Sequence, residues 1–355
     1  MTFVTIMALL ASTLSSDQLV LTGRSGDETA LYSFAIDEEQ FHKIGPGRND
    51  GSPRWSPDGD SIAFETDTDT GRGIGIIDAA GEGLTVVSNL YASNRWPRWS
   101  PDGKRLAYSS GTSPNEVIVV YDLETRGETV WGGQQTGLLQ PVWLSTPSLL
   151  RSALQEDERY QSYSVESLSS KGLILAIGRS VVEEVQSTVI KLVTPTVCLP
   201  APEELLDTPN NTYVEWSAEP SKNDRAIAYE SNDGGDREIF IASKGKVFDV
   251  SNHFSTDWNP VWSPDGKWLI FESFREKRWG LYRVHRDTSR LFVVASEPGM
   301  DFVSPDWSAD SENIISIIRV GDQHFLGMLT RGGELKKQFE LPFSAASDPK
   351  WRPVR

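Results

Sequence analysis

The chain has 355 residues, of which 50 are Asp or Glu and 34 are Lys or Arg, and its net charge is −16. No basic run interrupts this acidity, which argues against nucleic-acid binding because phosphates require a Lys/Arg face. The single cysteine, Cys198, excludes an intrachain disulfide and a cysteine-based zinc cluster, and we expect it to be a small buried hydrophobe.

Residues 1–16 form an N-terminal segment that differs from the rest of the chain. Residues 3–14 are apolar and rich in small residues, and Thr13 and Ser15 suit the cleavage site of a secretory signal. The positively charged start of such a signal is missing apart from the α-amine. Two interpretations stay open, namely an export signal and a packed or frayed N-terminal segment. The stretch is too short to span a bilayer as a helix, so we expect no membrane span.

Residues 17–355 are predicted to form one all-β domain. The stretches 18–22, 31–36 and 41–44 have the composition of the second, third and fourth strands of a β-propeller blade that lacks its first strand. A suitable first strand stands at the other end of the chain, at 349–352. Pairing the two ends would close the ring and remove two exposed sheet edges.

A repeated motif carries this prediction. Pro-x-Trp-Ser-Pro-Asp-Gly occurs at 53–59, 97–103 and 260–266, and each copy is followed by a strand such as Ile62-Ala63-Phe64. Pro and Asp favour the corners of a tight turn, and Gly supplies its positive φ. Weaker copies place further tryptophans at 143, 216, 307 and 351, so that the seven motif tryptophans are spaced by 44, 44, 73, 46, 45 and 44 residues. A period of roughly 40–50 residues with several strands is typical of propeller blades.

These residues resemble the TolB-type repeat, and the resemblance extends from about Leu19 to Arg352. It implies a propeller with protein-binding function in the periplasm. TolB itself joins an α/β domain to a six-bladed propeller, and the same repeats occur in dipeptidyl-peptidase-like enzymes. No α/β domain is evident in this sequence, so the repeat transfers and the whole TolB architecture does not.

The fourth repeat departs from the pattern, because the Asp-Gly turn is missing after Trp143. We place its third strand near 160–166 and its fourth near 172–177, which leaves an insertion at about 178–211 with a strand at 187–193. The insertion could instead be a degenerate eighth blade. Seven four-stranded blades are predicted, with eight or six as alternatives.

The sequence contains no recognisable catalytic motif. It has no Gly-x-Ser-x-Gly elbow, no His-Glu-x-x-His pair and no phosphate-binding Gly loop. The four histidines fall in different blades, at His42, His253, His285 and His324. We therefore expect no catalytic residue, no metal and no cofactor. A metal site assembled across the channel, as in a carbohydrate lyase, or a hydrolase with channel-facing carboxylates, is the alternative.

The candidate binding site lies in the segments that lead from one blade to the next, just before the motif proline. Asp50, Asn94 and Asp257 occupy the same place in their repeats, and their side chains could simply cap the turn. Aromatic and Arg side chains beside them are not needed by a turn and are typical of recognition surfaces. The candidate set is Asp50, Asn94, Arg95, Trp96, Asp257, Trp258, Asp301 and Phe302. Its acidic members favour a cationic partner.

The sequence therefore predicts a non-catalytic, exported binding scaffold that presents one mouth of its channel to a protein or peptide. A monomer in the periplasm or another extracytoplasmic compartment is expected, with the cytoplasm as the alternative location.

Overall fold

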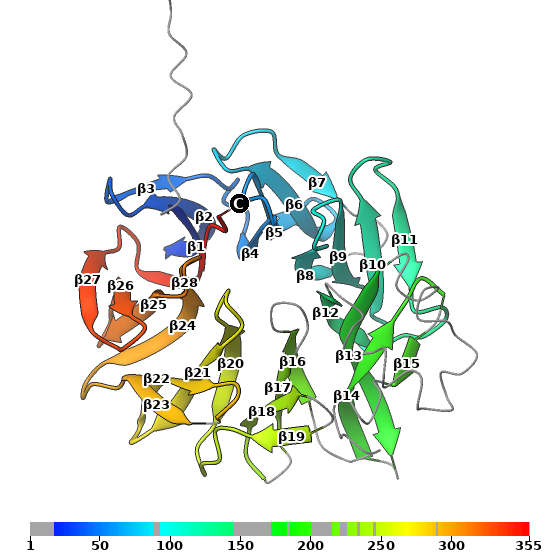
Figure 1. Ribbon diagram of the computed structural model, residues 1–355. Coiled ribbons are helices and arrows are strands. Elements are labelled where there is room, and N and C mark those ends of the chain that lie inside the picture. The colour runs from blue at the N-terminus through cyan, green and yellow to red at the C-terminus, as the bar shows by residue number, and fades with distance from the viewer. Residues whose placement is uncertain are drawn as a thin grey trace, which may run out of the picture.

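Seven four-stranded antiparallel sheets form a ring around a central channel (Figure 1), which confirms the predicted seven-bladed propeller. The structure is a computed structural model and describes residues 18–87, 93–144, 172–182, 185–196, 198–200, 215–220, 226–232, 235–243, 246–288 and 290–354. Within these ranges all regular elements are strands, and no helix is long and apolar enough to cross a membrane. The proposed signal segment at 1–16 lies outside the described residues.

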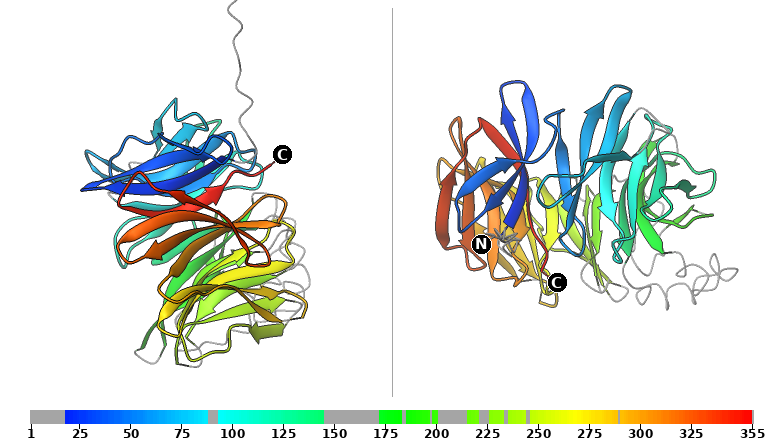
Figure 2. Two further views of the ribbon diagram at one scale, coloured as in Figure 1. Left: turned by 90° about the vertical axis from the view of Figure 1, so that its left-hand side faces the viewer. Right: turned by 90° about the horizontal axis from the view of Figure 1, so that it is seen from above.

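Each blade is a meander that runs from the channel outward (Figures 1 and 2). The first blade consists of β28 (Ala345–Trp351), β1 (Gln18–Ser25), β2 (Glu28–Ala35) and β3 (Gln40–Lys43). The second consists of β4 (Gly51–Trp55), β5 (Ser61–Thr68), β6 (Gly71–Asp78) and β7 (Thr85–Val87). The third consists of β8 (Asn94–Trp99), β9 (Arg105–Ser110), β10 (Val117–Asp122) and β11 (Glu128–Trp131).

The other four blades repeat this order. The fourth consists of β12 (Leu138–Leu144), β13 (Leu173–Val182), β14 (Val185–Val193) and β15 (Cys198–Pro200). The fifth consists of β16 (Glu215–Pro220), β17 (Ile227–Ser231), β18 (Glu238–Ser243) and β19 (Lys246–Asp249). The sixth consists of β20 (Asp257–Trp262), β21 (Trp268–Arg275), β22 (Arg278–His285) and β23 (Leu291–Ala295). The seventh consists of β24 (Asp301–Trp307), β25 (Asn313–Val320), β26 (Gln323–Thr330) and β27 (Leu335–Glu340).

The two ends of the chain close the ring, which confirms the predicted pairing. β28 lies antiparallel to β1, with Leu19 opposite Trp351 and Thr22 opposite Ser347. Arg352 continues the contact: its Nε donates to the Gly59 carbonyl of the next blade at 2.8 Å. The C-terminal residues thus contact β1 in their own blade and Gly59 in the second blade, both distant in sequence.

The strand assignment within the fourth blade was wrong. The residues from Leu173 onward are its second strand, and 187–193, which we placed in an insertion, belong to its third strand, β14. The fourth strand is β15, so most of the predicted insertion at 178–211 is blade. The third strand expected at 160–166 lies outside the described residues, as does 201–211. The mistake arose because a missing Asp-Gly turn removed the signal that locates the second strand after Trp143.

The motif tryptophan explains the constant period of the repeat. Trp55 Nε1 donates to the Lys350 carbonyl at 3.0 Å, and Trp99 Nε1 donates to the Arg54 carbonyl at 3.0 Å. Trp143 and Trp307 bond the preceding inner strand in the same way, through the carbonyls of Arg98 and Val261. Each of these buried indoles therefore links two neighbouring inner strands, so the repeat must return a Trp to the same place in each blade.

The hydrophobic core lies between blades. One cluster joins Ala63 and Ile74 of the second blade to Leu106 and Tyr108 of the third. Another joins Leu19 and Phe34 of the first blade to residues of the seventh, including Ile315 and Leu326. Side chains from two sheets fill each gap, because a sheet can bury its two faces only against its neighbours.

Candidate functional site

A bulge in the inner strands builds one mouth of the channel. The residue before the motif proline has positive φ in six blades, at Ser52, Trp96, Gln140, Asn259, Ser304 and Asp348. The pairing between the first and second strand shifts at the same points, for example between Trp258 and Val261. A left-handed non-glycine residue at a bulge is strained and usually needs a partner for its amide.

Buried glutamates of the preceding blade supply that partner. Trp96 N donates to Glu65 Oε1 at 2.9 Å, and Asn259 N donates to Glu230 Oε1 at 2.8 Å. Ser304 N donates to Glu272 Oε1 at 2.9 Å. Each glutamate directly follows the aromatic residue of a second strand, as in Phe64-Glu65 and Phe271-Glu272. The carboxylates therefore hold adjacent blades together at the channel.

Three of the predicted site residues are buried beneath this mouth. Asp50, Asn94 and Asp257 are at most 1% exposed. Asp50 accepts hydrogen bonds from Thr66 Oγ1 at 2.7 Å and Gly47 N at 2.8 Å. Asn94 donates to the Arg72 carbonyl at 2.8 Å and accepts from the Ser110 hydroxyl. The bond from Gly47 N matches the capping interpretation for Asp50, whereas Asn94 instead joins its strand to Arg72 of the preceding blade and to Ser110.

Asp257 differs because a second acid lies beside it. Burial raises the pKa of Asp257 to about 6. Burial, together with the charge of Asp257, raises the pKa of Glu238 to about 8, against a hydrogen bond from the Ser251 hydroxyl. Arg275 Nη2 is 3.9 Å from Asp257 Oδ1. The site thus contains an acid pair with a strong tendency to hold a proton.

The remaining predicted residues are divided between two cavities and the core. Arg95 and Trp96 line a cavity of about 260 Å³ with Ser109, Glu116 and others. Within the described ranges, Ser109 Oγ is buried there without a hydrogen-bond partner. Asp301 accepts from Trp279 N at 2.8 Å. Phe302 is 3% exposed and packs in the core between blades six and seven.

Trp258 lies in the larger cavity, of about 470 Å³, at the inner edges of blades four to seven. Its lining is polar and aromatic: Gln140, Glu230, Arg237, Trp258, Asn259, Glu272, Trp279, Val303, Ser304 and Arg319. The rings of Trp258 and Trp279 stack with centroids 4.5 Å apart and planes 2° from parallel. The Arg237 guanidinium lies 5.7 Å from the centroid of Trp258. Trp258 and Trp279 therefore form a rigid aromatic wall beside charged groups.

The carboxylates of this cavity already have partners. Glu272 accepts hydrogen bonds from Trp258 Nε1 at 3.0 Å, Asn259 Nδ2 at 2.6 Å and Ser304 N. Burial raises the pKa of Glu272 above its usual range, although these donors oppose the shift. Glu230 Oε2 is 3.3 Å from Arg237 Nη1. By contrast, Arg319 Nε is buried without a hydrogen-bond partner among the residues that the structure describes.

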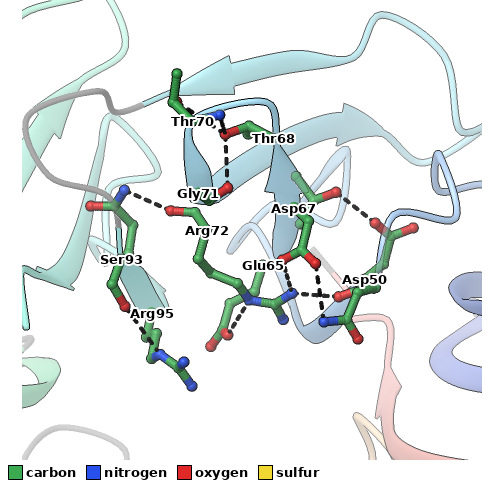
Figure 3. A network of polar contacts seen from close by, with 12 residues as sticks. Asp50, Glu65, Asp67, Thr68, Thr70, Gly71, Arg72, Ser93 and Arg95 are labelled. Carbon is green, nitrogen blue, oxygen red and sulfur yellow. Dashed lines mark hydrogen bonds and ion pairs between the residues drawn. The ribbon is translucent and has the colours of Figure 1, made fainter.

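The corresponding place in blade two is filled by ion pairs (Figure 3). Arg72 Nε is 3.1 Å from Glu65 Oε2, and its Nη1 is 2.9 Å from Asp67 Oδ1. The same Nη1 donates to the Asn49 carbonyl at 2.5 Å. Residues 66–71 form the end of the β5–β6 hairpin, which positions these groups.

Metal-binding geometry is not found in the part of the chain that the structure describes: no group of three or more His, Cys, Asp or Glu side chains converges there. His42 lies on β3, His285 on β22 and His324 on β26, and His253 lies between β19 and β20. Cys198 is partly buried against the core, and burial raises its pKa to about 11.

Sequence reasoning missed Glu230, Glu272, Trp279 and Arg319. A signal for the glutamates was present, because Glu follows an aromatic residue in the second strand of three repeats, ten residues after the motif Trp at Glu65 and Glu272 and fourteen after it at Glu230. Nothing comparable marks Trp279 or Arg319, which come to the channel from the β21–β22 and β25–β26 hairpins.

No protein-family model matches the sequence, and no curated protein matches it. Solved structures share the fold. TolB from Acinetobacter baumannii is 16% identical with a TM-score of 0.58, over 95% of this chain and 67% of TolB. The β-propeller domain of the Trilobed protease from Pyrococcus furiosus is 14% identical with a TM-score of 0.64, over 92% of this chain and 95% of that domain.

An acylaminoacyl peptidase is 13% identical with a TM-score of 0.62, and this chain spans about half of its length (51%). The Trilobed protease propeller is described as having an open velcro topology, whereas here β28 and β1 close the ring. Likeness at these identities shows the fold: the chain is a seven-bladed β-propeller whose structural neighbours include TolB and the propellers of peptidases.

Proposed function

We propose that this protein is an exported, non-catalytic binding module of the TolB type, and that it holds a peptide segment of a partner protein in the cavity beside Trp258. The observation that carries the proposal is the combination of a cavity of about 470 Å³, the Trp258–Trp279 wall and the unpartnered Arg319 Nε. Trp and Arg side chains in such pockets supply most of the binding energy at protein interfaces.

The way Trp258 is held supports a binding role. Glu272 accepts a hydrogen bond from its indole Nε1, and Trp279 stacks on its ring. A side chain that is already fixed loses little conformational entropy on binding, so more of the contact energy appears as affinity. The cavity volume is in the range of sites that take a small ligand or a few peptide side chains.

The residues that line this site are not the same set that we expected from the sequence. Asp50, Asn94, Asp257 and Phe302 are buried and do not line it, whereas Trp258 faces the cavity, and Arg95 and Trp96 belong to the smaller cavity. Export rests on the N-terminal segment, and the periplasm is the compartment that we propose. We further propose a monomer that binds neither nucleic acid nor a membrane.

Selection from a phage library of short random peptides on the immobilised full chain tests the proposal. We expect enriched peptides whose affinity, measured by calorimetry, falls by about 2 kcal/mol in Trp258→Ala. Lys267→Glu is the control, because this exposed side chain lies on the motif turn at the other end of the inner strand. Its affinity should match that of the parent protein.

Two outcomes would contradict the proposal. One is a peptide that binds equally well to the parent protein and Trp258→Ala at unchanged thermal stability. The other is stoichiometric Mn, Ca or Zn in the purified protein together with turnover of a peptide or a polysaccharide, which would favour the enzyme alternative.

A further inference from the structure

Arg319 is a cation whose guanidinium lacks an acceptor in the described part of the molecule. It lies on β25, opposite Asp301 of β24 and His324 of β26. Its Nε is buried, and its guanidinium forms no hydrogen bond or ion pair with a described residue. The charge of Arg319 favours the ionised form of the buried Glu272 carboxyl, but no hydrogen bond joins the two groups. A buried donor of a charged group without a hydrogen-bond partner is costly, so the fold leaves the Nε of Arg319 unsatisfied.

The neighbouring groups cannot easily provide the acceptor. The two oxygens of Glu272 already accept three hydrogen bonds, and those of Glu230 are engaged by Arg237 and the Asn259 amide. Asp301 Oδ1 accepts from Trp279 N. Hence a group from outside the chain is best suited to provide acceptor oxygens for Arg319.

The surroundings restrict the chemistry of that group. A guanidinium presents paired N–H donors in one plane and binds a carboxylate with two parallel hydrogen bonds, which is stronger than a bond to a neutral carbonyl. The Trp258–Trp279 wall lines the same cavity and offers apolar surface to the remainder of the ligand.

We propose that Arg319 recognises a carboxylate of the bound peptide while Trp258 and Trp279 hold the adjoining apolar part. This inference rests on the proposed function and specifies its ligand. It replaces the expectation of a cationic partner, because the acidic residues behind that expectation are buried or already paired. The carboxylate could be the C-terminus of the peptide or an Asp or Glu side chain.

The chain offers a matched control for the charge. Arg283, on β22, also has a buried Nε without a partner, but it lies over the Trp268 ring, 4.2 Å from its centroid, and does not line the cavity. Arg319→Gln and Arg283→Gln therefore remove the same charge from two residues whose Nε is buried without a hydrogen-bond partner among the described residues. Only the first removes it from the cavity.

Three versions of one enriched peptide are titrated into the full-length protein: the acetylated free acid, its C-terminal amide with every Asp and Glu replaced by Asn and Gln, and the amide that keeps its acidic side chains. We expect at least one carboxylate form to bind about tenfold or more tightly than the neutral form. Which form does so identifies the source of the carboxylate. Arg319→Gln should remove the preference, and Arg283→Gln should keep it.

Equal affinity of all three forms for the parent protein would overturn the inference. So would a carboxylate preference that persists in Arg319→Gln. In either case a loss of binding in Trp258→Ala would leave the binding function standing. Failure of every peptide to bind would overturn both.

A measurement without ligand gives a second readout. Since Arg319 has an unmet donor in the free protein, Arg319→Met should raise the melting temperature while it weakens binding of the carboxylate peptide, as expected for a site that is strained for function. A lower melting temperature would indicate that Arg319 serves the fold, and would overturn the inference.

Discussion

Blades two and six place a buried glutamate at the same position and give it different partners. Glu65 and Glu272 stand at equivalent places in β5 and β21, and each accepts the bulge amide of the next blade. Across the hairpin, Arg72 of blade two corresponds to Trp279 of blade six. Arg72 binds Glu65 and Asp67, whereas Trp279 stacks on Trp258.

This difference shows which features of the repeat serve the fold and which are available for binding. In blade two the charges satisfy one another and join neighbouring blades (Figure 3). In blade six an aromatic replaces the cation, Glu272 takes neutral donors, and a cavity lies beside the unpartnered Arg319. Blade six therefore lacks the internal ion pair at the position where we propose the binding site.

The largest effect is expected where the ion pair of blade two is broken. Arg72→Met leaves Glu65 buried without its cation, and we expect the free energy of unfolding to fall by about 3–5 kcal/mol. Denaturant unfolding measures it. Peptide binding at the cavity of blade six should be unchanged when measured below the new unfolding transition.

Arg95→Met is the control, because replacing this exposed side chain should change the free energy of unfolding by less than about 0.5 kcal/mol. Equal losses from both variants would contradict the assignment.

The acid pair beside blade six should make stability depend on pH. Asp257 of this pair faces Glu238. Asp50, which is equivalent to Asp257 in the second repeat, instead accepts hydrogen bonds from the Thr66 hydroxyl and the Gly47 amide. Because the folded pKa of Glu238 is raised to about 8, the folded state binds the proton more tightly than the unfolded state. Its contribution to stability is therefore complete below the ordinary glutamate pKa and is lost as the pH rises to about 8.

Glu238→Gln should accordingly flatten the fall in unfolding free energy between about pH 5 and pH 8. At pH 8 we expect a gain on the order of 2 kcal/mol relative to the parent protein. Thermal or denaturant unfolding over this pH range provides the measurement, with the exposed Asp69→Asn as control. A variant that loses stability at pH 8, or that keeps the parent pH dependence, would show that the pair is ionised in the fold.

A smaller effect tests the comparison by converting one blade into the other. Trp279→Arg combined with Phe274→Asp gives blade six the side chains that Arg72 and Asp67 provide in blade two. The new Arg should pair with Glu272, so stability should change by only about 1 kcal/mol, because a buried ion pair and apolar packing are often similar in net worth. Peptide affinity should fall about tenfold as the aromatic wall is lost. Retained affinity in the folded double variant would remove Trp279 from the site.

Sequence reasoning recovered the architecture because its determinants are local and repeated. The Ser-Pro-Asp-Gly turn satisfies itself within a few residues: Asp58 accepts from the Ser56 hydroxyl at 2.6 Å, and Gly59 has the left-handed φ of 74°. The motif Trp makes the same contact to the preceding inner strand at Trp55, Trp99, Trp143 and Trp307, so its spacing predicts the repeat, and the last copy, at Trp351, predicts the closure by 349–352. In the fourth blade this local signal is absent, and there the strand assignment was wrong.

The site, by contrast, depends on residues brought together by the ring. The candidate positions before the motif proline included Trp258, which lines the larger cavity, and also Asp50, Asn94, Asp257 and Phe302, which are buried. Distance along the chain says which strand a residue joins, but not whether its side chain faces a neighbouring blade or the channel. Glu272 meets the Ser304 amide only because blades six and seven lie side by side in the ring, whereas Trp258 meets Trp279 across β21 within blade six. The sequence by itself therefore determined the ring, and only the tertiary structure decided which of its charges are satisfied within the fold and which, like Arg319, are not.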